Sequence, residues 1–232
     1  MKKIVVLTGA GISAESGVAT FRDSGGLWEQ YSIEDVCTPG GWARNPKLVT
    51  EFYNARRRQT MTVRPNKAHE LVKELEKHYD VRVITQNVDN LHEQAGTQDV
   101  VHLHGELMKV TSSFDPNNPR YIQERTPDNL DVEIGETAAD GSQLRPFIVW
   151  FEEPVPLIDE AARICQTADI FIIIGTSLNV YPAAGLTQFV PEHAPIYLID
   201  PAPVRWNSLR PFTHIQKGAS EGMAELMKLL GC

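Results

Sequence analysis

The segment from His102 to Glu106 carries a group of side chains that could take part in chemistry. His102, His104 and Glu106 alternate with Leu103 and Gly105. If the segment is a regular strand, these three side chains share one face, because successive strand residues point to opposite sides. Imidazole and carboxylate groups are zinc ligands, so a zinc hydrolase is one interpretation. Motifs elsewhere in the chain compete with it, because they suit a dinucleotide.

A glycine-rich turn follows the apolar run Ile4 to Thr8. Residues Gly9 to Ala14 read GAGISA, a GxGxxA pattern that can present backbone N–H groups to a pyrophosphate. The pattern alone is weak, and the usual dinucleotide site also needs an acidic residue at the end of a second strand. Glu29, Glu34 and Asp35 lie where no strand is predicted. Either a dinucleotide is held in another way or the turn is structural.

Asn87 and Asp89 follow another apolar run, Val81 to Ile84. Asn and Asp are ordinary turn residues, so a purely structural role is one interpretation. The carboxyl ends of parallel strands are also where α/β proteins form their sites. We expect Asn87 and Asp89 to lie at such an edge.

Short runs rich in β-branched residues alternate with segments of helical periodicity along the chain. The runs are continuously apolar, which indicates strands buried on both faces in a parallel sheet covered by helices. The fold is therefore predicted to be α/β and doubly wound. Strands are predicted at 4–7, 81–84, 170–174 and 196–199, and helices at about 47–60, 69–78, 157–166 and 220–230.

Two polar insertions interrupt this alternation and predict a smaller lobe within a single domain of residues 1–232. The small lobe combines a helical segment, about 29–64, with a Pro-, Asn- and Gly-containing segment, about 111–143. The large lobe takes the remainder, about 1–28, 65–110 and 144–232.

Composition limits the location and the partners. The formal net charge is −8, whereas a nucleic-acid binder needs a clustered positive surface, so we expect no nucleic-acid partner. The longest apolar run is far shorter than the ~20 residues of a membrane span, so we expect no membrane partner. Three dispersed cysteines form no CxxC pair, which favours a reducing cytoplasm. The oligomeric state is open.

Five separated motifs together resemble the sirtuin family of NAD-dependent protein deacylases. They are GAGISAESGV from Gly9, FRD from Phe21, TQNVDNLH from Thr85, HG at His104 and GTSL from Gly175. The match spans nearly the whole chain in family order. It implies a Rossmann-like form of the doubly wound sheet, NAD as a consumed co-substrate, and acyl-lysine proteins or peptides as partners.

The resemblance also implies roles for individual residues. His104 would be the general base, accepting a proton from a ribose hydroxyl, and Asn87 would act with it. Asp89 would hold the nicotinamide amide together with the backbone at Ile12. Residues implied to contact NAD are Gly9, Ala10, Gly11, Ile12, Ala14, Phe21, Arg22, Gln86, Asn87, Asp89, Gly175, Thr176, Ser177, Asp200 and Ala219. Asp200 stands where the family usually has Asn, and its carboxylate can still accept from ribose hydroxyls.

The sequence departs from the family in the segment that follows the catalytic His-Gly. Sirtuins usually bind a structural zinc there through two CxxC pairs. The first expected cysteine position is Ser112, and no cysteine occurs between Cys37 and Cys165. We therefore expect no metal, neither structural nor catalytic, and residues 111–143 must be held by their own packing or be mobile.

The peptide-binding stretch departs as well. The family pattern Phe-Gly-Glu becomes Phe151-Glu152-Glu153. We expect Val149, Trp150 and Phe151 to keep an extended form that can pair with a substrate backbone.

Tyr53 and Arg56 resemble the Tyr-x-x-Arg signature of the sirtuins that remove succinyl, malonyl and glutaryl groups. Residues three apart share a helix face, so the hydroxyl and the guanidinium can converge on one distal carboxylate. A solvated helix face with a packed tyrosine is the structural alternative. The resulting prediction is a desuccinylase or demalonylase that releases nicotinamide and O-acyl-ADP-ribose. A plain deacetylase, an NAD glycohydrolase or ADP-ribosyltransferase, and a non-catalytic NAD or peptide binder are the competing functions.

Overall fold

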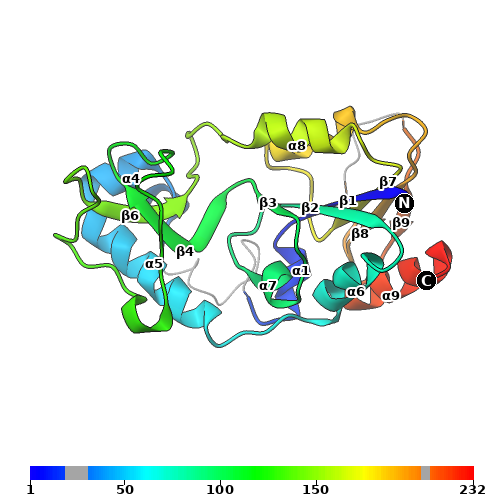
Figure 1. Cartoon of the computed structure of the whole chain (residues 1–232), viewed down its shortest axis with the longest axis horizontal. Helices are drawn as coiled ribbons and strands as arrows, with labels where there is room; N and C mark the ends of the chain where they lie inside the picture. The colour runs from blue at the N-terminus through cyan, green and yellow to red at the C-terminus, as the bar shows by residue number, and fades with distance from the viewer. Residues whose placement is uncertain (19–30, 205–209) are drawn as a thin grey trace.

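The computed structural model describes residues 1–18, 31–204 and 210–232. A six-stranded sheet, in the order β3-β2-β1-β7-β8-β9, organises most of the chain, and all of its paired strands are parallel (Figure 1). The strands are β1 Lys3–Thr8, β2 Asp80–Thr85, β3 Val100–His102, β7 Ile170–Ile174, β8 Ile196–Ile199 and β9 Thr213–Ile215. The predicted α/β class and all four predicted strands are confirmed.

Helices cover both faces of this sheet because the strands are apolar on both faces. Alternate β1 residues point to opposite sides, so Ile4 and Val6 pack toward α6 (Lys67–Leu75) and α9 (Ala219–Leu230). Val5 and Leu7 pack toward α8 (Ile158–Cys165) and the 3₁₀ helix η2 (Ala183–Phe189). Figure 1 shows α8 on one side of the sheet and α6 and α9 on the other. None of the described helices has both the length and the hydropathy of a membrane span.

A second, antiparallel sheet has the order β5-β4-β6. Its strands are β4 Gly105–Ser112, β5 Gln123–Glu124 and β6 Leu144–Ile148. Figure 1 shows this sheet beside α4 (Pro39–Arg44) and α5 (Pro46–Thr60), at the opposite end of the molecule from α9. In the described part of the chain, the other short helices are α1 Gly11–Ala14, α3 Ile33–Val36, α7 Leu91–Gln94 and η1 Pro127–Asn129. The proposed lobe boundary at residues 110 and 111 falls inside β4.

Residues 111–143 are held by their own packing, which is one of the two predicted outcomes. Val110, Val132, Ala138 and Leu144 form a small buried apolar cluster. At the expected cysteine position, Ser112 Oγ donates to Asp140 Oδ2 at 2.6 Å and accepts from the backbone N–H groups of residues 114 and 115. A cluster of hydrogen bonds therefore lies where the family pattern would place its first cysteine.

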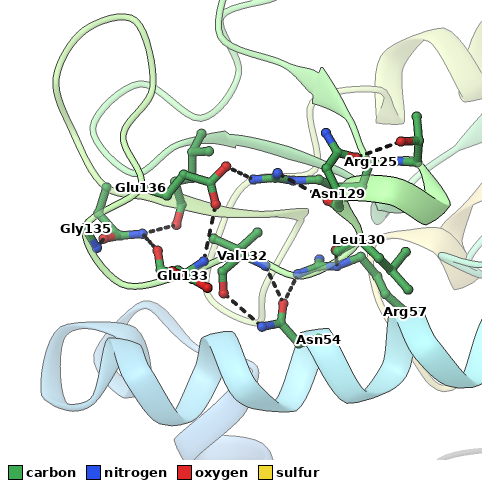
Figure 2. A network of polar contacts seen from close by, with 12 residues as sticks. Asn54, Arg57, Arg125, Asn129, Leu130, Val132, Glu133, Gly135 and Glu136 are labelled. Carbon is green, nitrogen blue, oxygen red and sulfur yellow. Dashed lines mark hydrogen bonds and ion pairs between the residues drawn. The ribbon is translucent and has the colours of Figure 1, made fainter.

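The helix α5 binds this segment through Asn54 and Arg57 (Figure 2). Asn54 Nδ2 donates to the Val132 carbonyl at 2.9 Å, and Asn54 Oδ1 accepts from the Val132 N–H at 3.0 Å. Arg57 is fully buried, and it donates to Asn54 Oδ1 and to the Leu130 carbonyl. Burial lowers the pKa of Arg57 to about 10, so the guanidinium stays charged at neutral pH. These bonds satisfy backbone groups that would otherwise be buried without partners.

We predict that Asn54→Ala lowers the free energy of unfolding by about 2–4 kcal/mol, because it leaves buried groups of Val132 and Arg57 without a partner. Urea unfolding measures this loss. The control is Gln59→Ala, an exposed position on the same helix, which should change stability by less than about 0.5 kcal/mol. Equal stability of the two variants would contradict the structural role of Asn54.

Two buried histidines meet edge to face between α6 and α7. The rings of His69 and His92 lie 5.0 Å apart, and His69 Nε2 and His92 Nδ1 have no hydrogen-bond partner. Burial lowers the pKa of His69 to about 4 and that of His92 well below its ordinary value. Both rings are therefore neutral in the folded protein at neutral pH.

We predict that stability falls as the pH drops from about 6.5 to about 4. In this window the unfolded chain binds protons that the folded rings exclude, which costs about 1.4 kcal/mol per pH unit for each histidine. His69→Gln, which can still accept from the Asn66 N–H, should flatten this dependence. Urea unfolding at pH 7 and pH 5 gives the comparison, and an unchanged difference between the two pH values in His69→Gln would refute it.

Candidate active site

The glycine turn after β1 lies directly on the end of β7. Gly11 N–H donates to the Gly175 carbonyl at 2.9 Å, and Gly9 N–H donates to the Ile174 carbonyl at 3.0 Å. A Cβ atom on Gly11 would lie 2.6 Å from Gly175 Cα, and Gly175 itself has φ +63°. Close backbone contact therefore explains these glycines. The turn is followed by the single helical turn α1, which includes the buried Ile12 and ends at Ala14, with Ala10 as its N-cap.

Asn87 and Asp89 meet the glycine turn through Ser13. Asn87 Nδ2 donates to the Gly9 carbonyl and to Ser13 Oγ, both at 3.1 Å. Ser13 Oγ in turn donates to Asp89 Oδ2 at 3.0 Å. Burial raises the pKa of the Asp89 carboxyl, although hydrogen bonds from the Leu91 N–H and Ser13 oppose this shift. Ser13 is absent from the predicted set, because a serine in a tight turn gives no signal of its own.

His104 is arranged as a proton acceptor. Its Nδ1 lies 3.0 Å from the Gln86 carbonyl, which can only accept, so we assign the ring hydrogen to Nδ1 and the lone pair to Nε2. Burial lowers the pKa of His104, which keeps the ring neutral. A neutral imidazole with an available Nε2 can act as a general base.

The zinc interpretation required His102, His104 and Glu106 on one face of a regular strand, and this premise is wrong. β3 ends at His102 and β4 begins at Gly105, so His104 lies in the connection. The Glu106 carboxylate pairs with Lys109 at 2.8 Å. Over residues 1–18, 31–204 and 210–232, no group of three or more His, Cys, Asp or Glu side chains is placed to hold a metal ion.

The last residues in the set implied to contact NAD, from Gly175 to Ala219, lie at the ends of β7 and β8 and at the start of α9. Gln86 Nε2 donates to Thr176 Oγ1 at 3.1 Å, which joins the ends of β2 and β7. Asp200 is buried after β8, and its Oδ1 accepts from the Ala202 N–H at 2.9 Å. Ser177, after β7, is half-buried, and Ala219, the first residue of α9, is buried. Phe21 and Arg22 lie outside the described residues.

The Glu15 carboxylate connects the glycine turn to α9. Glu15 Oε1 accepts from the Ser220 N–H at 3.0 Å. It therefore satisfies one of the free N–H groups of that helix. This contact ties the turn to the start of α9, where Ala219 is implied to contact NAD, and Glu15 is also absent from the predicted set.

Tyr53 and Arg56 lie next to each other on α5, as their spacing predicts. The Tyr53 hydroxyl accepts from Trp150 Nε1 at 3.1 Å and lies 3.5 Å from Cys37 Sγ. Arg56 is half-buried, with its guanidinium carbon 5.8 Å from the centre of the Phe52 ring. Burial lowers the pKa of Arg56, while attraction to Tyr53, Cys37 and Asp89 opposes this shift. The positive charge of Arg56 therefore also attracts the Asp89 carboxylate of the polar cluster.

The predicted peptide stretch is less extended than expected. β6 ends at Ile148, and Val149 N–H donates to the His104 carbonyl at 2.9 Å. Trp150 is buried, with its ring 3.4 Å from the Arg145 guanidinium carbon, so its side chain supports Tyr53. Phe151 is exposed, and Glu152 turns the chain with φ +74°. The prediction of an extended form through Phe151 is therefore wrong, because the chain turns at Phe151 and Glu152, and Glu152 takes the position where the family has glycine.

Comparisons with known proteins agree with this geometry. A model of the Sir2 family matches residues 9–182. A Bacteroides thetaiotaomicron protein named NAD-dependent protein deacylase is 61% identical over 230 residues, covering 99% of this chain and 98% of that protein. A Helicobacter pylori protein of the same name is 51% identical over 230 residues, with 99% and 98% covered. The crystal structure of a Sir2 homolog–NAD complex superposes with a TM-score of 0.86 at 37% identity, covering 99% of this chain and 90% of that one. The chain belongs to the Sir2 family.

Proposed function

We propose that this protein is an NAD-dependent protein-lysine deacylase that prefers acyl groups ending in a carboxylate, such as succinyl and malonyl. The enzyme class follows from membership of the Sir2 family and from the full-length relatives of that name. The acyl preference rests on one observation: Tyr53 and Arg56 lie three residues apart on α5, and their side chains interact electrostatically.

The residues at the carboxyl ends of the strands fit NAD. Asn87 and Gln86 offer amide groups, Asp89 and Asp200 offer carboxylate oxygens, and all of them lie along one edge of the parallel sheet. Such groups can bind the carboxamide and the ribose hydroxyls of a dinucleotide. When bound, NAD supplies the ribose carbon that receives the acyl oxygen as nicotinamide leaves.

His104 takes the proton in this proposal. Its Nδ1–H is held by the Gln86 carbonyl, so Nε2 faces the reaction with its lone pair and accepts the proton of a ribose hydroxyl. The ring is neutral before the reaction because burial lowers its pKa. One water molecule supplies the second oxygen of the ester that forms, and the products are free lysine, nicotinamide and O-acyl-ADP-ribose.

A carboxylate on the acyl group suits the surroundings of Arg56. A charged guanidinium binds a carboxylate through short, charge-assisted hydrogen bonds, which are about twice as strong as neutral ones. The Tyr53 hydroxyl accepts from Trp150, so its own hydrogen is directed to Cys37 Sγ or to an acyl oxygen. An acetyl group has no carboxylate to offer, so it forms none of these bonds.

We predict that His104→Ala reduces kcat by about 100-fold or more, the usual contribution of a general base. Mass spectrometry of the products from NAD and succinyl-lysine peptide gives both the rate and the identity of the reaction. His193→Ala, at an exposed site outside the sheet edge, is the control. Full turnover in His104→Ala would exclude the mechanism, and ADP-ribose in place of O-acyl-ADP-ribose would identify an NAD glycohydrolase.

We predict that Arg56→Met lowers kcat/KM for succinyl-lysine peptide by about 10- to 150-fold, because hydrogen bonds to a charged group contribute about 1.5–3 kcal/mol. Activity on the acetyl peptide should change little. Tyr53→Phe should show a smaller loss of the same kind. The matched control is Arg58→Met, two residues along the helix, where the exposed guanidinium pairs with Asp131. A wild-type preference for acetyl that survives in Arg56→Met would refute the carboxylate preference.

A further inference from the structure

The His102 ring is buried between two oxygen acceptors. Its Nδ1 lies 2.9 Å from the Asn87 carbonyl oxygen, and its Nε2 lies 2.7 Å from Glu93 Oε1. A backbone carbonyl has no hydrogen to give, so Nδ1 must be the donor. The short contact to Glu93 also needs a proton between the two atoms. His102 therefore donates through both ring nitrogens, from Nδ1 to the Asn87 carbonyl and from Nε2 to the Glu93 carboxylate.

The charges around His102 favour the imidazolium form. Burial opposes the charge, but the hydrogen bond and attraction to Glu93 outweigh it, so the pKa of His102 is raised. Burial raises the pKa of Glu93, but the hydrogen bond from His102 and the attraction to its charge outweigh burial. The pKa of Glu93 is therefore lowered. The other charged groups that act on this pair are Glu106 of β4, Asp89 and Lys109.

His102 donates the hydrogen bond that the backbone carbonyl of Asn87 accepts. The Asn87 N–H donates to Thr85 Oγ1 at 3.0 Å, and its carbonyl accepts from His102. With both backbone groups held, the Asn87 side chain is aimed at the Gly9 carbonyl and Ser13 Oγ. Loss of the bond from His102 would free the Asn87 carbonyl and leave the Asn87 N–H as the remaining backbone contact of this residue.

The two histidines hold neighbouring carbonyls but differ at Nε2. His104 binds the Gln86 carbonyl and His102 binds the Asn87 carbonyl, each through Nδ1. Glu93 occupies Nε2 of His102, so this ring cannot accept a proton as His104 can. His104 can therefore act as a base, whereas His102, two residues earlier, can only hold the backbone.

We propose that His102, supported by Glu93, is a positioning residue that fixes the Asn87 backbone and thereby the Asn87 carboxamide for the NAD-dependent step. This inference rests on the proposed function. It predicts that the Nδ1–H bond to the Asn87 carbonyl matters more than the filling of space by the ring.

Two substitutions separate these roles. The amide nitrogen of Asn can take the place of Nδ1, whereas that of Gln takes the place of Nε2. His102→Asn should keep the bond to Asn87 and stay within about 3-fold of wild type in kcat/KM for NAD. His102→Gln should lose about 10-fold or more, which is the effect of one hydrogen bond to a charged group. Its KM for the acyl-peptide should not change.

Glu93→Gln tests whether Glu93 holds the His102 ring in place. A Gln amide can donate to a neutral His102 Nε2 and keep the ring in place, so this variant should retain more activity than Glu93→Ala. His193→Gln, an exposed histidine, is the control for histidine substitution in general. Thermal unfolding of every variant identifies any that fail to fold.

Hydrogen exchange makes the result independent of catalysis. Amides of residues 86–91 should exchange faster in His102→Gln than in His102→Asn or wild type. Equal exchange and equal rates in the two folded His102 variants would overturn the positioning role. If wild type shows no NAD-dependent deacylation of any acyl-lysine peptide while the exchange difference persists, the proposed function fails and the positioning role stands.

Discussion

The site depends on the close contact between the backbone of Gly11 and that of Gly175. This contact places the turn after β1 on the end of β7 with no side chain between them. Any Cβ at Gly11 would move the turn and therefore the position of Ser13. Because Ser13 joins Asn87 to Asp89, the polar cluster inherits its geometry from this glycine contact. The glycines thus act through packing, in addition to any contact with a phosphate.

The helix α5 contacts two parts of the proposed enzyme. One side of the helix carries Tyr53 and Arg56, which lie toward Cys37, Trp150 and the cluster around Asp89. The residues that follow each of them, Asn54 and Arg57, hold the segment around 130–132. A helix turns by about 100° per residue, so adjacent residues can serve neighbouring surfaces. The same turns of helix therefore carry the residues of the proposed acyl contacts and support the segment that lacks the family cysteines.

The sequence was sufficient for the elements whose burial is uniform. β7 and β8 are apolar throughout and β1 is apolar from Ile4 to Leu7, because both faces are covered, whereas β2 is interrupted by the exposed Arg82. Helices such as α5 and α9 show clear periodicity. β3 and β9 have three residues each, too few to give a pattern. The small antiparallel sheet was not predicted, because its strands pair across long polar loops. α6 ends at Leu75, before the predicted end at residue 78, since the chain turns there into β2.

Part of the site could also be predicted. The spacing of Tyr53 and Arg56 and the strand-end position of Asn87 and Asp89 were readable because helix and sheet geometry fix them. The contacts of Ser13, Glu15 and Trp150 were not, because each depends on segments distant in sequence. The same limit applies to His102. Its alternation with His104 suggested a shared metal, whereas the break between β3 and β4 gives the two rings different partners.

The hydrogen-bonded cluster of Ser112, Asp140 and Ser142 has a consequence for how this segment responds to oxidants. A cysteine thiolate is a target for oxidation, whereas hydroxyl and carboxylate groups are not. No cysteine lies between Cys37 and Cys165. Thiol oxidation therefore has no target in this segment, and the hydrogen bonds of the cluster do not depend on the redox state of the surroundings.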